Sequence, residues 1–214
     1  MIKTLLKRDL GLAFFGNGYF FNSLALFVIA TILLTFIMQT TSLSIILLPY
    51  IFASLLAAPQ IFQEDNNNST LDQLIVTGHP SFYIVIAKLI CHLFQSLIIF
   101  VITVPILCFI YNITMGDRLL HIYLTLLTLT ISVSSLVTLA SGLTLRVNNG
   151  VIITCLIVMP LLISILLYTA SILDSIVAGT AISILLVDFK IMMVLSFITS
   201  IVAVLACSYV LTKI

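Results

Sequence analysis

One polar segment, residues 62–80, holds the residues whose types and spacing could do chemistry, and it reads FQEDNNNSTLDQLIVTGHP. Its carboxylates are Glu64, Asp65 and Asp72, and long apolar runs lie on both sides of it. No serine–histidine–carboxylate constellation stands out, and a chain with three histidines offers little for acid–base catalysis. The chemistry that the segment indicates is recognition, in which Glu64 and Asp65 meet basic residues of a partner.

A helix start signal lies inside this segment. The run TLDQ, which begins at Thr70, fits a capping box: the Thr70 hydroxyl accepts a hydrogen bond from the Gln73 amide, and the Gln73 side chain reaches back. Asp72 falls in the first turn, where the helix dipole favours a negative charge. The pattern therefore predicts that a helix begins here.

A helix stop signal follows closely. Gly78 suits a left-handed C-cap, and Pro80 prevents continuation. We predict a short helix over 71–77, which would not be stable alone in water. Its apolar stripe consists of Leu71, Leu74 and Ile75. From the residues alone, this helix is either a coupling element that docks into a separate motor protein or an ordinary connector between two spans.

The elements that position this segment are predicted to be membrane-spanning helices. The chain is 62% hydrophobic and 7% charged, with a mean hydropathy of +1.36, whereas a soluble domain carries roughly a quarter charged residues. We predict an all-α, polytopic membrane protein that forms a single domain over residues 1–214 with six spans. The predicted spans are about 20–38, 43–62, 82–111, 119–143, 151–171 and 191–212.

Two stretches outside these spans also favour helices. Residues 1–16 mix basic and apolar side chains, which is typical of an amphipathic helix in the headgroup region; a simple basic anchor is the alternative. Residues 172–190 contain an apolar stretch bounded by Asp174 and Asp188. This stretch is short for another span, so we expect an interfacial or re-entrant helix, with a seventh span as the alternative.

The placement of lysine and arginine predicts the orientation. If the N-terminus is cytoplasmic, the basic residues on that side are Lys3, Lys7, Arg8, Lys88, Arg146 and Lys213. Only Arg118 and Lys190 then lie outside. The positive-inside rule therefore places both termini, and the loop 63–81, in the cytoplasm.

Two polar residues fall inside the third predicted span. Lys88 and His92 are four residues apart, so they share a helix face and are the candidate intramembrane polar pair. His92 and His121 are the candidate haem ligands, because a haem iron would need an imidazole. The alternatives are packing for His92 and an interfacial anchor for His121, while His79 is interpreted as a solvated loop residue.

Several functions are excluded or disfavoured by what the sequence lacks. No G-x-x-x-x-G-K-[ST] occurs, so the chain does not bind nucleotide through a P-loop, and we expect it not to be an enzyme. The four cysteines each stand alone in apolar runs, which predicts neither disulfides nor a metal site. A net charge of +1 argues against nucleic acid as a partner. No resident cofactor is expected.

The polar segment resembles the cytoplasmic loop of the CcmB family, the permease subunits of the ABC complex of cytochrome c maturation. That loop reads approximately F-x-x-D-x-x-D-G-S-L-[DE]-Q-L, followed by a turn with proline and by A-K-x-x-x-H. The matching residues are Phe62, Asp65, Leu71, Asp72, Gln73, Leu74, Pro80, Ala87, Lys88 and His92. The chain departs at Asn68, where the family favours Asp, and at Ser69, where it favours Gly. Chain length, a basic start and the number of spans are also similar.

The resemblance implies an ABC-2-type exporter permease in the bacterial cytoplasmic membrane, with the mitochondrial inner membrane as the alternative. It implies a separate ATPase subunit, CcmA, together with CcmC and CcmD, and release of the haem-loaded chaperone CcmE. Haem would be the substrate handled. An ATPase dimer offers two grooves, so two copies of the chain, or one copy together with another permease, would serve it. In this interpretation Phe62 anchors the loop, and the residues that contact the ATPase are Asp65, Leu71, Asp72 and Leu74.

Two other functions fit the same features. One is an ABC-2-type permease that exports a lipid or another small molecule. The other is a scaffold that assembles a haem-handling complex without transporting anything. Related exporters carry a similar T-L-x-x-L loop, so the family assignment depends on the combination of motifs. The chain has no tryptophan, so it does not resemble CcmC, which handles haem through a tryptophan-rich segment.

Overall fold

The computed structural model describes residues 2–15, 19–38, 42–58, 60–67, 69–78, 80–111, 118–145, 150–179 and 182–212. In these ranges all the regular secondary structure is helical. The elements are α1 (Ile2–Phe15), α2 (Tyr19–Met38), η1 (Leu43–Ile46), α3 (Leu47–Ala57), α4 (Gln60–Asn67), α5 (Thr70–Val76), α6 (Ser81–Ile110), α7 (Arg118–Leu143), α8 (Gly150–Ala178) and α9 (Ile182–Thr212).

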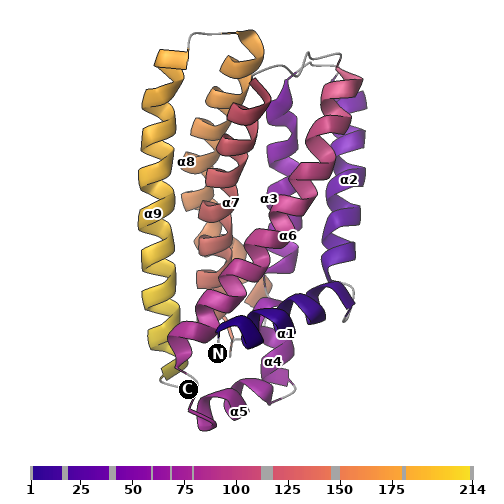
Figure 1. Ribbon diagram of the computed structural model, residues 1–214. Coiled ribbons are helices and arrows are strands. Elements are labelled where there is room, and N and C mark those ends of the chain that lie inside the picture. Colours follow the sequence, from indigo (N-terminus) through magenta and orange to yellow (C-terminus); the bar gives the residue numbers. More distant parts are fainter. Residues whose placement is uncertain are drawn as a thin grey trace.

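Five of the described helices are long and apolar enough to cross a membrane, which confirms an all-α, polytopic membrane protein. The stretches concerned are Phe20–Met38, Ser81–Ile110, Arg118–Leu143, Val158–Ala178 and Leu186–Thr212. The long helices stand side by side, whereas α1, α4 and α5 gather at one end of the bundle, where both chain ends also lie (Figure 1). We call this end the α1 end.

The second predicted span, 43–62, differs from the structure. Its apolar helix covers only Leu43–Ala57, and a separate helix, α4, begins at Gln60. Fifteen helical residues are about 22 Å long, less than the hydrocarbon core of about 30 Å. The sequence has a proline at position 59, and a proline has no N–H for the preceding turn. The apolar run therefore divides into a short membrane helix and a helix that begins the polar segment.

The expected interfacial or re-entrant helix at 172–190 is wrong, and so is the seventh span. Residues up to Ala178 continue α8, and α9 already begins at Ile182. The turn between them includes Gly179, whose φ of +79° suits glycine. Buried apolar residues, Leu173 among them, extend the core face of α8 to its last turn. The two helices are thus longer than the predicted spans, and three residues, 179–181, separate them.

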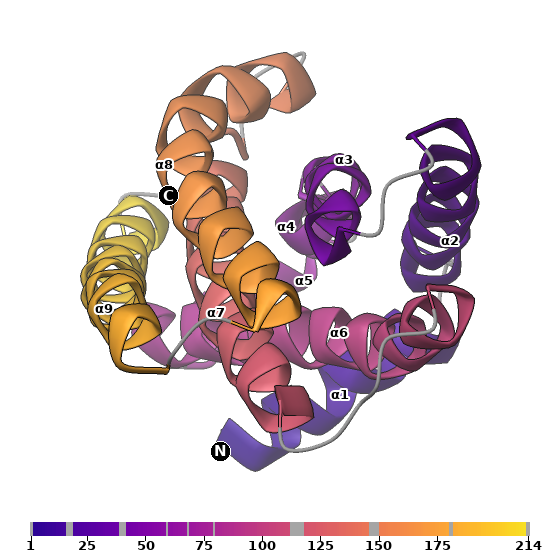
Figure 2. The same cartoon turned by 90° about the horizontal axis from the view of Figure 1, so that it is seen from above.

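Helix α7 lies at the centre of the bundle. In its most apolar stretch 78% of residues are buried, against 22% for α2 and α9. Viewed along the bundle, α7 lies among α6, α8 and α9 (Figure 2). Buried serine and threonine hydroxyls line it, and most donate to carbonyls one turn back in the same helix, as Thr125 does to His121 and Ser132 to Thr128. Small side chains satisfied in this way let neighbouring membrane helices approach closely.

Candidate coupling site

The site lies where the polar segment folds against the α1 end of the bundle. Helix α5 covers Thr70–Val76, one residue earlier at each end than predicted. Gly78 adopts the left-handed conformation expected of it, with φ +79°, and its N–H donates to the Ile75 carbonyl at 3.0 Å. The C-cap of α5 that the sequence predicts at Gly78 is therefore confirmed. His79 and Asn68 lie outside the described residues.

The predicted capping box does not form. Ser69 is the N-cap, and no side chain caps the helix. The Thr70 hydroxyl instead donates to Asp65, at 3.0 Å to its backbone oxygen and at 2.9 Å to Oδ1. This happens because residues 60–67 form a helix of their own, which brings Asp65 close to Thr70. The threonine therefore ties α5 to α4.

Ser69 has a backbone conformation that is unusual for serine. Its φ of 55° lies in the left-handed region, and it is the one such residue other than glycine among those described. A Cβ makes this conformation costly, so glycine is preferred there. The resembling family favours glycine at this position, and the geometry supplies the physical reason.

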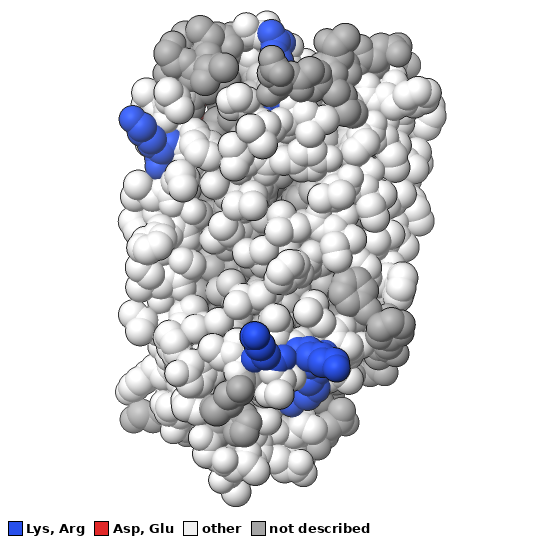
Figure 3. All heavy atoms as spheres, in the orientation of Figure 1, with Lys and Arg blue, Asp and Glu red and all other residues white. Residues whose placement is uncertain are grey.

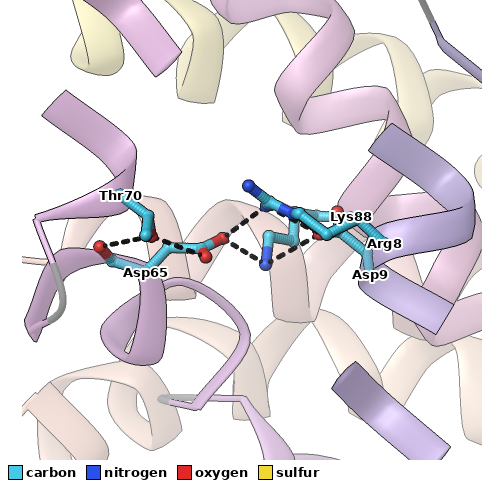
Figure 4. Close-up of polar contacts among 5 residues, drawn as sticks. All are labelled: Arg8, Asp9, Asp65, Thr70 and Lys88. Carbon is cyan, nitrogen blue, oxygen red and sulfur yellow. Dashed lines mark hydrogen bonds and ion pairs between the residues drawn. The ribbon is translucent and has the colours of Figure 1, made fainter. Parts of the chain in front are cut away.

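A cluster of two cations and two carboxylates joins α1, α4 and α6 (Figure 4). Asp65 Oδ2 lies 2.5 Å from Lys88 Nζ and 3.0 Å from an Arg8 guanidinium nitrogen. Asp9 Oδ1 lies 2.7 Å from Arg8 and 3.7 Å from Lys88 Nζ. Each cation therefore contacts both carboxylates. We call these four residues the ion-pair cluster.

The ion-pair cluster is largely withdrawn from solvent. Asp9, Asp65 and Lys88 are buried, while about a third of the Arg8 side chain is exposed (32%). Burial alone would raise the pKa of Asp65, but Lys88, Arg8 and the bond from Thr70 hold it below its ordinary value. Burial also opposes the charge on Arg8, yet Asp9 and Asp65 raise the pKa of its guanidinium. The contacts of the cluster therefore favour the charged forms of Arg8 and Asp65.

An apolar cluster on the same side fastens α5 to the spans. It consists of Phe62, Leu71, Ile84, Val85, Cys207 and Leu211, from α4, α5, α6 and α9, with Leu74 and Ile75 partly buried against it. Phe62 is 0% exposed and Leu71 is 1% exposed. Phe62, the first residue of the loop motif, and Leu71, in its second half, therefore pack in one core.

The predicted partner-contacting residues divide into two groups. Asp65 and Leu71 are buried inside this chain, Leu74 is half-buried, and Asp72 is exposed. Gln73 is also exposed, and Val76 has 85% of its surface free. The part of α5 that is open to a partner is therefore its outer face, namely Asp72, Gln73 and Val76. Asp65 and Leu71 hold that face in place.

The candidate haem ligands do not come together. His92 is buried, and its Nδ1 lies 2.9 Å from the Ser134 hydroxyl of α7. Lys88 is on the same helix, but its ammonium group binds Asp9 and Asp65. His121 lies in the first turn of α7, at the opposite end of the bundle from α1 (Figure 1). Among the described residues there is no group of three or more metal-ligating side chains.

Sequence reasoning missed Arg8 and Asp9 as members of the site. A signal was present, because Asp9 falls on the apolar face of a basic amphipathic helix, four residues after Leu5, which is buried. A carboxylate at such a position needs a buried cation. Lys88, alone within an apolar run, was the natural candidate.

The fold and the site define the class of protein: an all-α, multi-pass membrane protein with a compact polar unit, α4 and α5, at one end. The chain belongs to the CcmB protein family, whose pattern it matches over residues 1–212. Three proteins named "Heme exporter protein B" are similar to it. The protein from Rhodobacter capsulatus is 27% identical over 190 residues, which cover 86% of this chain and 87% of that protein. The proteins from Pseudomonas aeruginosa and Haemophilus influenzae are 25% and 23% identical, over 84% and 80% of this chain and 83% and 80% of their own length.

Proposed function

We propose that the chain is the membrane permease subunit of an ABC transporter complex for cytochrome c biogenesis. It would couple ATP hydrolysis in a separate subunit, CcmA, to haem export or to release of the haem-loaded chaperone CcmE. Family membership and the names of the relatives support the haem-related role. The observation that carries the coupling role is the Asp65–Lys88 ion pair, which links the α4–α5 unit to the membrane helix α6.

The contacts of α4 and α5 make these helices suitable for transmitting force. Thr70 bonds α5 to α4, Asp65 bonds α4 to α6 and α1, and Leu71 packs against α6 and α9. A force on the outer face of α5 would therefore be transmitted through these contacts and displace α6. Rigid-body movement of helices of this kind is a common way to couple two sites.

The motor must come from another chain, because the sequence contains no P-loop. CcmA would supply it, CcmC and CcmD would complete the membrane assembly, and two copies of this chain would serve the two grooves of an ATPase dimer. Haem would be a substrate that the complex handles, not a resident cofactor of this chain. The exposed face of α5, with Asp72, Gln73 and Val76, is the proposed contact with CcmA.

The charge distribution supports an orientation with the α1 end in the cytoplasm of a bacterial cell. On the face shown in Figure 3, basic side chains lie near the two ends, and the described surface between them has none, as a lipid-facing band requires. Lys3, Lys7, Arg8 and Lys88 belong to elements at the α1 end, whereas Arg118 and Lys190 belong to the opposite end. By the positive-inside rule, this distribution supports a cytoplasmic location of both termini.

Co-purification of CcmA tests the proposal. Val76→Asp puts a charge on the exposed face of α5 without touching the buried contacts, so CcmA should be lost while the chain still inserts and folds. Lys7→Gln is the matched control, because Lys7 is also exposed at the α1 end but lies on α1. Retention of CcmA, with full stimulation of its ATPase activity, in Val76→Asp would show that α5 is not the coupling surface.

Deletion of the gene separates the proposal from its two alternatives. Loss of c-type cytochromes is expected here, whereas a permease for a lipid or another small molecule would leave them normal. A scaffold would tolerate a CcmA that cannot hydrolyse ATP. The proposed coupling role requires that this inactive CcmA be as damaging as the deletion.

A further inference from the structure

A buried hydrogen bond joins the membrane helices α6 and α7 one turn beyond the ion-pair cluster. His92 Nδ1 of α6 lies 2.9 Å from the Ser134 hydroxyl of α7. His92 is 5% exposed and Ser134 is 0% exposed. An imidazole is costly to bury without a hydrogen-bond partner, and an ionisable residue inside a span is by default a candidate for a functional role. Neither residue belongs to the ion-pair cluster or to the exposed face of α5.

Ser134 differs from its neighbours on α7 in the partner of its hydroxyl. The buried hydroxyls of Ser132 and Ser135 donate to carbonyls of their own helix, at Thr128 and Ser132. Such bonds satisfy a polar group but do not connect two helices. The Ser134 hydroxyl pairs with a side chain of α6. Because lipid provides no hydrophobic drive for two helices to associate, a directional hydrogen bond between them helps to fix how they lie against each other.

His92 belongs to a buried polar row on α6 that starts in the ion-pair cluster. Lys88 lies four residues before it, and residues at this spacing share a helix face. The Lys88 ammonium group binds Asp65 of α4. Ser96, four residues after His92, is also buried and donates to the His92 carbonyl at 3.0 Å. The polar contacts of α6 with α4 and with α7 are therefore one helical turn apart, about 6 Å along the helix axis.

The packing of α7 makes this contact a suitable route into the bundle. Helix α6 crosses the bundle obliquely and packs against α7 (Figure 1). Helix α7 in turn packs against α8 and α9 (Figure 2). A displacement at Lys88 is carried over one turn to His92, because an intact helix is a rigid element. The bond between His92 and Ser134 then passes the displacement from α6 to α7.

We infer that His92 is a positioning residue, which transmits movement of the α4–α5 unit from α6 to α7 through its bond to Ser134. The inference rests on the proposed coupling function and adds to it a path inside the membrane. In this arrangement Nδ1 has to pair with a hydroxyl. The imidazole does not have to bind haem or to carry a charge.

The amount of c-type cytochrome formed per ATP hydrolysed tests this role. It is the cytochrome yield of cells that express the variant, divided by the ATPase activity of the same intact complex in isolated membranes. His92→Phe removes the bond and keeps a ring, and Ser134→Ala removes it from the other side. Both variants should retain the ATPase subunit and its activity, whereas the ratio should fall by about five- to tenfold, as expected for one hydrogen bond.

Two further variants control this measurement. The double variant His92→Phe/Ser134→Ala should be no worse than the single ones, because each removes the same contact. Ser132→Ala is the matched control, since it deletes a buried α7 hydroxyl that bonds within its own helix. It should keep the wild-type ratio.

His92→Asn and His92→Gln separate the bond to Ser134 from other uses of the imidazole. The amide of asparagine lies about where Nδ1 lies, so it can pair with the Ser134 hydroxyl. The amide of glutamine reaches the position of Nε2 instead. His92→Asn should therefore restore most of the ratio, and His92→Gln should not. A haem ligand would be lost in both variants.

Three results would overturn the inference. The first is a wild-type ratio in both His92→Phe and Ser134→Ala. The second is a loss of folded chain from the membrane in proportion to the lost cytochrome, because the pair would then only stabilise the fold. The third is a His92→Asn variant as defective as His92→Phe. Failure of the proposed function is distinguishable from all three, since c-type cytochromes would then form normally even when the gene is deleted.

Discussion

The Nζ atom of Lys88 lies 2.5 Å from Oδ2 of Asp65, and this ion pair joins a membrane helix to the polar segment outside it. The two residues are 23 positions apart (88 − 65) and belong to α6 and α4. Both are buried, and Arg8 and Asp9 of α1 complete the cluster. The N-terminal helix α1, helix α4 and the membrane helix α6 are therefore joined by one ion-pair cluster.

Breaking this joint on one side should destabilise the protein. Lys88→Met leaves Asp9 and Asp65 buried with Arg8 as their remaining cation, so the free energy of unfolding should fall by about 3 kcal/mol. The double variant Lys88→Met/Asp65→Asn should recover part of the loss, because one of the two buried charges is then removed as well. Thermal unfolding in detergent measures both. Asp72→Asn, an exposed carboxylate two residues after Thr70, is the control and should change little.

The same joint should make stability depend on pH. The pKa of Asp65 is lowered in the folded protein, so folding favours its ionised form. Its contribution is complete above the ordinary carboxyl pKa of about 4 and is lost as the pH falls through the lower folded value. Wild type should therefore be more stable than Asp65→Asn at pH 7, with a difference that shrinks toward pH 3. A constant difference over this range would contradict the ion-pair role.

Ser69→Gly should stabilise the coupling unit. Ser69 adopts a left-handed backbone conformation, with φ 55°. This conformation costs roughly 1 kcal/mol for a residue with a Cβ. Glycine removes that cost but loses some of the gain to its greater freedom in the unfolded chain. A rise in unfolding temperature, or slower proteolysis of residues 62–80, would show it. Ser69→Ala keeps the Cβ and should show no such gain.

The fold class follows from composition, because a chain with 7% charged residues cannot cover itself with a soluble surface. The caps at the two ends of α5 show where prediction from sequence stops. Gly78 acts locally and adopts the predicted conformation. The Thr70 hydroxyl, in contrast, bonds to Asp65 instead of to the predicted Gln73 amide. That exchange depends on the fold of α4, which lies outside the capping motif. Asp9 was missed for a similar reason, since one of its two cation partners, Lys88, is distant in sequence.

The contact between α7 and α9 should be intolerant of larger side chains. A Cβ added to Gly142 would collide with the sulfur of Cys207. Gly142→Ala should therefore cost about 1–3 kcal/mol, as overpacking usually does, and Cys207→Ala in the same chain should restore much of the loss. Gly11→Ala is the matched control: Gly11 is also helical and has open space around it, so this change should stabilise by roughly 0.5–1 kcal/mol. Unfolding temperatures of the three variants and the wild type provide the comparison.

Leu71 and Val76 lie on the same short helix, but substitution of each by aspartate should have a different effect. Leu71 is 1% exposed and packs with Phe62, whereas Val76 is 85% exposed. Leu71→Asp should lower the stability of the chain itself by several kcal/mol, about as much as emptying a buried leucine site or more. Val76→Asp should leave stability unchanged and remove the ATPase partner. If Leu71→Asp keeps the unfolding temperature of the wild type and only loses the partner, then Leu71 faces the ATPase, and the packing of α5 seen here is not the coupled state.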